Sequence, residues 1–160
     1  QELPRFGNIG VFNRSHYEDV LVARERKLVP DEVWKPRFEF INRFEALASD
    51  MGTRIVKIFL HIDRDEQRAR LLERLDDAAK AWKYQPSDLI DRQHWDEYQH
   101  AYEDVLAKTS TRVAPWYVVP ANKKWCRNVH VAQLLIDVLE AMNPQMPAPH
   151  FDRSKIRVPR

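Results

Sequence analysis

The sequence predicts one α/β domain with a parallel sheet. Short apolar runs alternate with longer stretches of helical periodicity, which is typical of strands joined by crossover helices. The runs are nearly continuous rather than alternating, so we expect strands that are buried on both faces. A length of 160 residues, with 44% hydrophobic residues and only three glycines, suits one helix-rich globular domain.

Three segments are expected to form the strands. The first is Ile9–Phe12, which ends at the polar residues 13–15. The second and clearest is Ile55–Ile62, and the third is Trp116–Val119, which is flanked by prolines. We expect His61 to lie in the second strand as a core or edge residue.

The first long helix is expected between Trp34 and Met51. Apolar side chains recur there every three or four residues, and Gly52 is a good stop signal. Pro36 predicts that the helix either starts near this point or is kinked there.

Three further helices follow. Asp63 and Glu66 form a capping-box pattern that predicts the start of the next helix. Its apolar face is expected to contain Leu72, Leu75, Ala79 and Trp82. Other helical patterns run from about Asp91 to Lys108 and from Val129 to Met142, and a proline-rich irregular tail follows at residues 144–160.

Composition excludes several classes of protein. The single cysteine, Cys126, cannot form an intrachain disulfide or a CxxC metal site. No run of eighteen apolar residues is present, so we expect a soluble, cytoplasmic protein without a membrane partner. The net charge of +2 is compatible with an anionic substrate, but it does not point to a nucleic-acid partner. The histidines show no metal-ligand spacing.

The first candidate site follows the first predicted strand, where ligands bind in open α/β sheets. Asn13 could organise Mg²⁺ or a phosphate there, and the Arg14 guanidinium could bind phosphate oxygens. Glu18 and Asp19 could hold a metal or orient an acceptor. The pattern supports equally a turn whose polar residues cap the following helix.

The second candidate site is the basic stretch from Arg64 to Arg92. Arg70 and Arg74 lie four residues apart, on one helical face, and basic and acidic residues follow at Lys80, Lys83, Asp88 and Arg92. Phosphoryl transfer needs cations around the moving phosphate, often on a segment that closes over it. The alternative is a solvated face on which acidic neighbours balance the arginines, and for a run of charges this alternative is favoured. Lys123 and Lys124, just after the third strand, are a weaker candidate for contacting a nucleotide.

In combination, these segments resemble the second family of polyphosphate kinases. The similarity covers nearly the whole chain in order, in the stretches Gly10–Leu21, Lys57–Ile62 with Glu66–Gln67 and Arg70–Leu71, Trp82–Lys83 with Asp88 and Trp95–Tyr98, and Thr109–Thr111 with Ala114–Tyr117 and Lys123–Lys124.

The resemblance implies a P-loop kinase fold similar to thymidylate kinase, with a three-layer parallel sheet and a helical lid at about residues 64–92. It implies a partial domain over residues 1–143 that is incomplete at the N-terminus. The implied activity is Mg²⁺-dependent, in-line phosphoryl transfer between inorganic polyphosphate and a nucleotide, AMP/ADP or GMP/GDP. Family members also lead us to expect a homo-oligomer.

The resemblance also implies roles for individual residues. Asn13 would occupy the Walker B position, Arg14 would contact phosphates, and Arg74 would act with them in catalysis. The implied substrate-binding residues are Tyr17, Glu18, Asp19, Arg70, Lys80, Lys83, Asp88, Arg92, Lys123 and Lys124. An acidic residue at Glu18 resembles the subgroup that also accepts nucleoside monophosphates. No metal ligand is assigned.

One feature departs from the family pattern. No GxxxxGK string is present, so the Walker A loop and the strand that precedes it have no counterpart, and the chain starts with Gln1. We therefore expect the isolated chain to be a fragment with little or no kinase activity. Two alternatives remain: a non-catalytic fragment that binds polyphosphate or mediates assembly, and a P-loop nucleotide kinase that uses ATP as donor.

Overall fold

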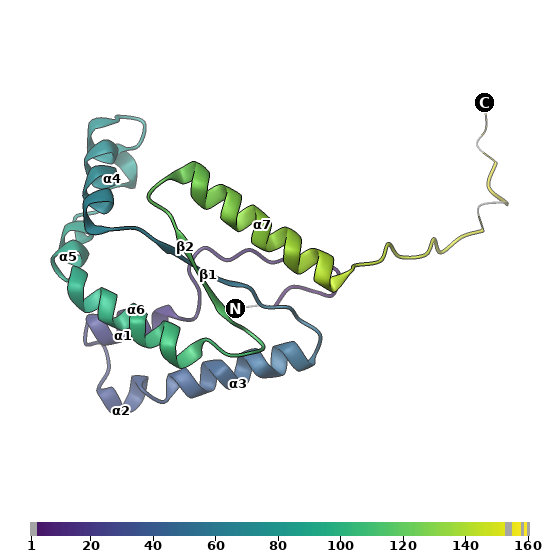
Figure 1. Ribbon diagram of the computed structural model, residues 1–160, viewed down its shortest axis with the longest axis horizontal. Coiled ribbons are helices and arrows are strands. Elements are labelled where there is room, and N and C mark those ends of the chain that lie inside the picture. The colour runs from purple at the N-terminus through teal and green to yellow at the C-terminus, as the bar shows by residue number, and fades with distance from the viewer. Residues whose placement is uncertain (1–2, 153–154, 158, 160) are drawn as a thin grey trace.

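A two-stranded parallel sheet forms the centre of the molecule. The computed structural model describes residues 3–152, 155–157 and 159, and in this part of the chain β1 (Lys57–His61) and β2 (Trp116–Pro120) pair in parallel. Lys57 lies opposite Trp116, and the register continues to His61 opposite Pro120. The strands run between α7 on one side and α1, α3 and α6 on the other (Figure 1).

In the described residues, groups of helices precede β1, separate β1 from β2 and follow β2. They are α1 (Glu18–Glu25), α2 (Asp31–Trp34), α3 (Arg37–Asp50), α4 (Arg64–Asp76), the 3₁₀ turn η1 (Ala81–Lys83), α5 (Ser87–Gln93), α6 (Trp95–Thr109) and α7 (Lys124–Met142). The predicted α/β class is therefore confirmed.

The second and third predicted strands are confirmed as β1 and β2, but the first is wrong. Residues 9–12 form neither a strand nor a helix, and Ile9 and Val11 are 76% and 90% exposed. A strand is stabilised by its ladder and by apolar neighbours. In the described part of the chain this segment has no strand beside it, so an apolar run alone does not make it a strand.

Local signals determine the ends of α2 and α3. The chain leaves α2 at Trp34 and starts α3 directly after Pro36, which lacks the N–H that a continuous helix would need. At the other end Gly52 has a φ of +90°, and its N–H donates to the carbonyl of Ser49. Gly52 thus ends α3 in a left-handed backbone conformation, as predicted from its position in the sequence.

The predicted cap of α4 is confirmed, but the predicted length of the helix is wrong. The Asp63 side chain accepts a hydrogen bond of 2.7 Å from the Glu66 N–H. The helix ends at Asp76, because the next residue, Asp77, is extended and its carboxylate accepts from the Ala79 N–H. Ala79 and Trp82 therefore do not continue the helical face.

The last two helical patterns are also confirmed with changed bounds. The pattern expected from Asp91 to Lys108 divides at His94 into α5 and α6. Helix α7 starts at Lys124, earlier than its apolar pattern indicates. No helix in the described ranges has the length and apolarity needed to cross a membrane. Every described residue after Met142 is exposed, and this tail runs away from the other elements (Figure 1).

The core lies between α1, α2, α3 and α6, on one face of the sheet. Its buried side chains are Tyr17, Val20, Leu21, Ala23, Trp34, Phe38, Ile41, Ala101 and Val105. Aromatic contacts connect the core to both strands, since Tyr17 packs edge-on against Trp116 and Phe59 stacks on Tyr102. Tyr17, which lies in the sequence between the residues of the first candidate site, is thus a core residue.

Two helices present apolar faces to solvent. On α3 these exposed side chains are Phe40, Phe44, Leu47 and Met51, and on α7 they are Trp125, Val129, Ile136 and Leu139. Helix α7 contacts β2 and has no buried residue. Exposed apolar faces on helices are typical of surfaces that contact another polypeptide.

Candidate functional site

The carboxyl ends of the two strands are joined to the start of α4. Asn122, which follows β2, accepts from the Asp63 N–H at 3.1 Å and donates to the Asp63 carboxylate. Arg70 extends from α4 and donates to the Ala121 carbonyl at 2.6 Å and to Glu66 at 2.8 Å. The sheet edge where an α/β protein binds ligands is therefore a rigid junction of β1, β2 and α4.

The basic residues of the predicted lid are largely paired with acidic ones. Arg74 of α4 binds Asp88 of α5 at 3.1 Å. Lys80 lies 2.8 Å from Glu73 and 2.9 Å from Asp77. These pairs connect α4 to the segment that follows it, and they correspond to the balanced face that the sequence also allowed.

The same contacts shift the protonation equilibria of the lid. Hydrogen bonds that the Lys80 ammonium donates to Glu73 and Asp77 raise the pKa of Lys80. In return, the Lys80 ammonium lowers the pKa of both carboxyl groups. Arg92, the last predicted lid residue, donates to the Gln67 side chain at 2.7 Å and to the Arg64 carbonyl at 2.8 Å. In this conformation the lid cations stabilise the lid itself.

Three predicted substrate-binding lysines remain exposed. Lys123 and Lys124 lie at the start of α7, just beyond the junction of the two strands, and the positive charge of Lys124 lowers the pKa of Glu73. Lys83 lies on η1, with its ammonium 5.2 Å from the centre of the Trp82 ring. A helix N-terminus with exposed lysines attracts anions.

The loop of residues 13–17, which we name the Asn13–Tyr17 loop, carries the first candidate site. Asn13 and Arg14 are exposed, and Arg14 has a φ of 69°, in the left-handed region that a residue with a Cβ rarely adopts. The Arg14 guanidinium lies 3.3 Å from Glu18 on α1. Asp19 is exposed at its side chain and accepts from Arg37 through its carbonyl. The loop therefore presents a cation and an amide to solvent.

Tyr17 lies in the core instead of at the surface. Its hydroxyl donates to Glu45 Oε1 at 2.6 Å and accepts from Lys57 Nζ at 2.9 Å. Lys57 also lies 2.7 Å from Glu45 Oε2 and donates to the Thr109 carbonyl at 2.7 Å. Trp116 completes the group by donating its indole N–H to Thr109 Oγ1. We name these side chains of Tyr17, Glu45, Lys57, Thr109 and Trp116 the buried polar network.

Burial and charge act in opposite directions in this network. Burial would raise the pKa of Glu45, but the nearby His16 ring, the hydrogen bonds from Lys57 and Tyr17 and the Lys57 charge hold it below its ordinary value. Burial lowers the pKa of Lys57, and Glu45 offsets part of that effect. Burial and the bond to Glu45 raise the pKa of Tyr17 well above its usual range. The structure thus contains an ion pair inside the core.

The sequence contains a signal for this pair. Glu45 lies four residues after Ile41 and three before Ala48, on the face of α3 that is buried. Lys57 is the first residue of β1 and is followed by three apolar residues. A charged residue at a core position of a helix and another in a central strand predict a buried pair.

The structure brings the segment predicted as a lid, the strand ends and the two lysines of α7 together, but it does not join them to the Asn13–Tyr17 loop. Among the described residues, no hydrogen bond or ion pair connects this loop to residues 64–92. Nor do three or more His, Cys, Asp or Glu side chains gather there in a way that could hold a metal ion.

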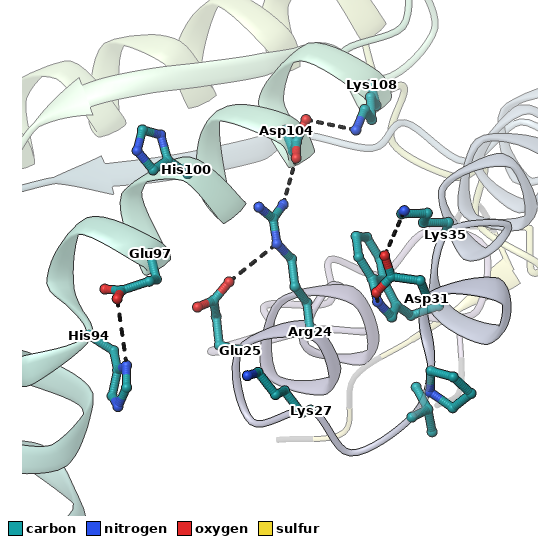
Figure 2. Close-up of a pocket in the computed structure, with 13 residues that line it drawn as sticks. Arg24, Glu25, Lys27, Asp31, Lys35, His94, Glu97, His100, Asp104 and Lys108 are labelled. Carbon is teal, nitrogen blue, oxygen red and sulfur yellow. Dashed lines mark hydrogen bonds and ion pairs between the residues drawn. The ribbon is translucent and has the colours of Figure 1, made fainter.

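A cavity of about 800 Å³ lies elsewhere, between the end of α1, the segment before α2, and α6. Most of its charges are paired with one another: Arg24 lies between Glu25 and Asp104, and Lys35 binds Asp31 (Figure 2). No residue predicted for the site lines this cavity. Because its charges are balanced internally, the cavity is a weaker candidate than the sheet edge.

These features define a class of protein. A parallel α/β sheet, a helical segment rich in paired cations and exposed lysines beside the strand ends are typical of proteins that handle phosphate groups. Comparison with known proteins then identifies the group: residues 1–147 match the sequence profile of the family described as polyphosphate kinase 2 (PPK2). The chain belongs to this family.

Individual relatives agree with this assignment. The AMP/ADP-polyphosphate phosphotransferase of Meiothermus ruber is 53% identical over 98% of this chain, and the ADP-polyphosphate phosphotransferase of Rhodopseudomonas palustris is 41% identical over 92%. The crystal structure of polyphosphate kinase 2 from Arthrobacter aurescens TC1 superposes with a TM-score of 0.90, at 46% identity over 95% of this chain.

The match covers only part of each relative. The chain spans 58% of the Meiothermus ruber protein, 55% of the Rhodopseudomonas palustris protein and 54% of the Arthrobacter aurescens structure. The chain therefore spans a little more than half the length of these three proteins.

Proposed function

We propose that this chain is the lid-bearing part of an enzyme that transfers a phosphoryl group between inorganic polyphosphate and a nucleoside mono- or diphosphate. The observation that carries the proposal is the similarity to proteins named as AMP/ADP- and ADP-polyphosphate phosphotransferases, over nearly all of this chain. The exposed lysines at the strand ends are consistent with a polyanionic substrate. Adenine nucleotides are the acceptors that these names indicate, and guanine nucleotides remain to be tested.

The proposal includes finer features of the fold. We infer a P-loop kinase-like arrangement in which residues 1–143 belong to one domain, residues 64–92 form its lid and residues 144–160 form a tail. The two parallel strands and the helices on either side of them support this arrangement. A cytoplasmic homo-oligomer remains part of the same proposal.

The residue roles follow from position and charge. Lys123, Lys124 and Lys83 are proposed to attract the polyphosphate chain, since their ammonium groups are exposed. Arg14 is proposed to contact phosphate oxygens, because its guanidinium extends from a loop in a strained conformation.

The paired lid cations require a rearrangement to act on substrate. Arg74 must exchange Asp88 for a phosphate, and Lys80 must exchange Glu73 and Asp77. Ion pairs that are partly exposed contribute only about 0–1 kcal/mol, so a polyanion can displace the carboxylates at low cost. The paired state is therefore a resting state of the proposed lid.

Mg²⁺ is proposed to enter with the substrate. It commonly retains water and substrate phosphate oxygens and needs only one or two protein carboxylates. Asn13, Glu18 and Asp19 are the oxygen-bearing side chains of the first candidate site that could contribute. These three side chains alone do not form a complete ligand set.

A phosphotransfer assay tests the proposal. The chain is assayed with polyphosphate, Mg²⁺ and AMP, ADP or GDP, both alone and fused behind the part of the Meiothermus ruber protein that it does not match. Because no GxxxxGK loop is present in this chain, we expect activity only in the fusion. Replacing polyphosphate by ATP as donor separates this activity from that of an ATP-dependent kinase.

Variants in the fusion test the lid. Arg74→Gln and Lys83→Ala should strongly reduce use of polyphosphate, whereas Arg43→Gln, at an exposed ion pair of α3, should not. Activity that survives both lid changes would refute the lid assignment. A fusion that folds but transfers no phosphate from either donor would refute the enzymatic proposal.

A second candidate function is assembly or polyphosphate binding without catalysis. The exposed apolar faces of α3 and α7 favour it, because such faces commonly contact another polypeptide. Tripolyphosphate binding by the isolated chain, together with an inactive fusion, would support this function instead.

A further inference from the structure

Glu45 and Lys57 form a buried ion pair, and neither residue belongs to the predicted substrate site. Their side chains are 0% and 5% exposed, and their atoms approach to 2.7 Å. Such a pair is weak support for stability, because the cost of removing two charges from water can exceed their attraction. A buried pair can instead fix the positions of the chain segments that it joins.

The pair lies where five segments of the chain meet. Glu45 comes from α3, Lys57 from β1, Thr109 from the end of α6 and Trp116 from the start of β2. The fifth member, Tyr17, ends the Asn13–Tyr17 loop, and its hydroxyl donates a hydrogen bond to Glu45 and accepts one from Lys57. The hydroxyl of Tyr17 is thus held from both sides, and its ring is fixed against Trp116 at 4.9 Å.

The loop next to Tyr17 needs such an anchor. Arg14 has a left-handed backbone, a conformation that persists only when its surroundings determine it. The Arg14 side chain itself is 78% exposed and supplies little restraint. Restraint comes instead from the other end of the loop, where His16 stacks on Tyr17 and lies 3.7 Å from Glu45 Oε1.

We propose that Glu45 and Lys57 are positioning residues that hold the Asn13–Tyr17 loop, and with it the Arg14 guanidinium, in place for binding phosphate. This inference rests on the proposed function for the purpose of the loop. The restraint itself is a property of this chain and can be measured without any catalytic activity.

The test removes both charges together, so that neither is left buried and unpaired. In a Glu45→Gln, Lys57→Met variant the volumes are similar and the interior stays neutral. Hydrogen exchange of the amides of residues 13–19 should accelerate by about tenfold or more, which corresponds to about 1.4 kcal/mol of local opening free energy. Exchange in α6 and β2 should accelerate much less than exchange in the loop, and affinity for tripolyphosphate should fall in parallel with the loss of loop protection.

Two further variants control the experiment. Glu39→Gln with Arg43→Met removes an exposed ion pair of the same helix, α3, and should change neither loop exchange nor affinity. Tyr17→Phe keeps the ring and the charged pair but removes the hydroxyl, and it should accelerate exchange in the loop as the double variant does. If the double variant does not fold, Tyr17→Phe carries the test.

The outcomes separate this inference from the proposed function. Unchanged loop exchange in the double variant and in Tyr17→Phe would overturn the positioning role, as would exchange that rises equally in all elements. If Arg14→Ala leaves tripolyphosphate affinity unchanged, the phosphate-binding role of Arg14 fails. The exchange data would still decide whether the buried pair holds the loop.

Discussion

Replacing Lys57 with methionine is expected to destabilise the protein strongly. The Lys57 ammonium donates to three oxygens within 2.9 Å, on Tyr17, Glu45 and Thr109. Without it, the fully buried Glu45 carboxylate has only the Tyr17 hydroxyl and the nearby His16 ring for compensation. Breaking a buried pair by removing one partner costs about 3–5 kcal/mol, and we expect a loss in the free energy of unfolding within this range.

The second charge provides the comparison that makes this estimate testable. With Glu45→Gln added to Lys57→Met, no buried charge remains, and the double variant should recover about 2 kcal/mol or more relative to the single one. For a chain of this length 1 kcal/mol corresponds to about 2–4 °C in Tm, so the single variant should melt roughly 6–20 °C lower than the parent.

Urea unfolding followed by circular dichroism measures both free energies. Arg43→Met, at an exposed ion pair, is the matched control, and its effect should stay within about 0.5 kcal/mol. If the single variant is as stable as the double variant, the carboxylate is not left uncompensated. The reasoning about the buried pair would then be refuted.

Three further predictions concern stability. The pKa of Glu45 is held below its ordinary 4.5, so its contribution to the free energy of unfolding is present above that pH and is lost as pH falls through the folded-state pKa. The stability of Glu45→Gln should lack this part of the acid dependence. Identical pH profiles of stability for the variant and the parent would contradict this prediction. Asp63→Ala removes the α4 cap and should cost about 1 kcal/mol in denaturant unfolding, whereas no change would show that the cap contributes nothing. Thr109→Val leaves the Trp116 N–H without its acceptor and should cost about 1–3 kcal/mol with a shift in indole emission; unchanged stability and emission would contradict this.

Several elements could be predicted because their signals are local. Pro36 and Gly52 delimit α3 through backbone chemistry that needs no distant partner, and Asp63 caps α4 through a residue only three positions away. The apolar runs at β1 and β2 form strands because each has the other as its neighbour. Family membership was also available from the sequence, since the resembling motifs follow one another along nearly the whole chain.

Other features depend on partners that are distant in the sequence. The apolar segment 9–12 matches a strand by itself, yet it remains exposed because a strand needs a hydrogen-bonded neighbour. Tyr17 follows polar motif residues, and only the tertiary structure shows that it is buried and hydrogen-bonded to side chains of α3 and β1. Periodicity identifies a helix face, but not which charged side chain will meet another across it.

The amino-acid sequence by itself determined the fold class, some helix ends and the family, because these depend on short-range backbone preferences and on the order of motifs. The tertiary structure alone decided that Glu45 and Lys57 pair in the core and that Arg74 binds Asp88. The physical reason is that a charge becomes a buried partner or a free ligand-binding group only through the side chains that packing places beside it.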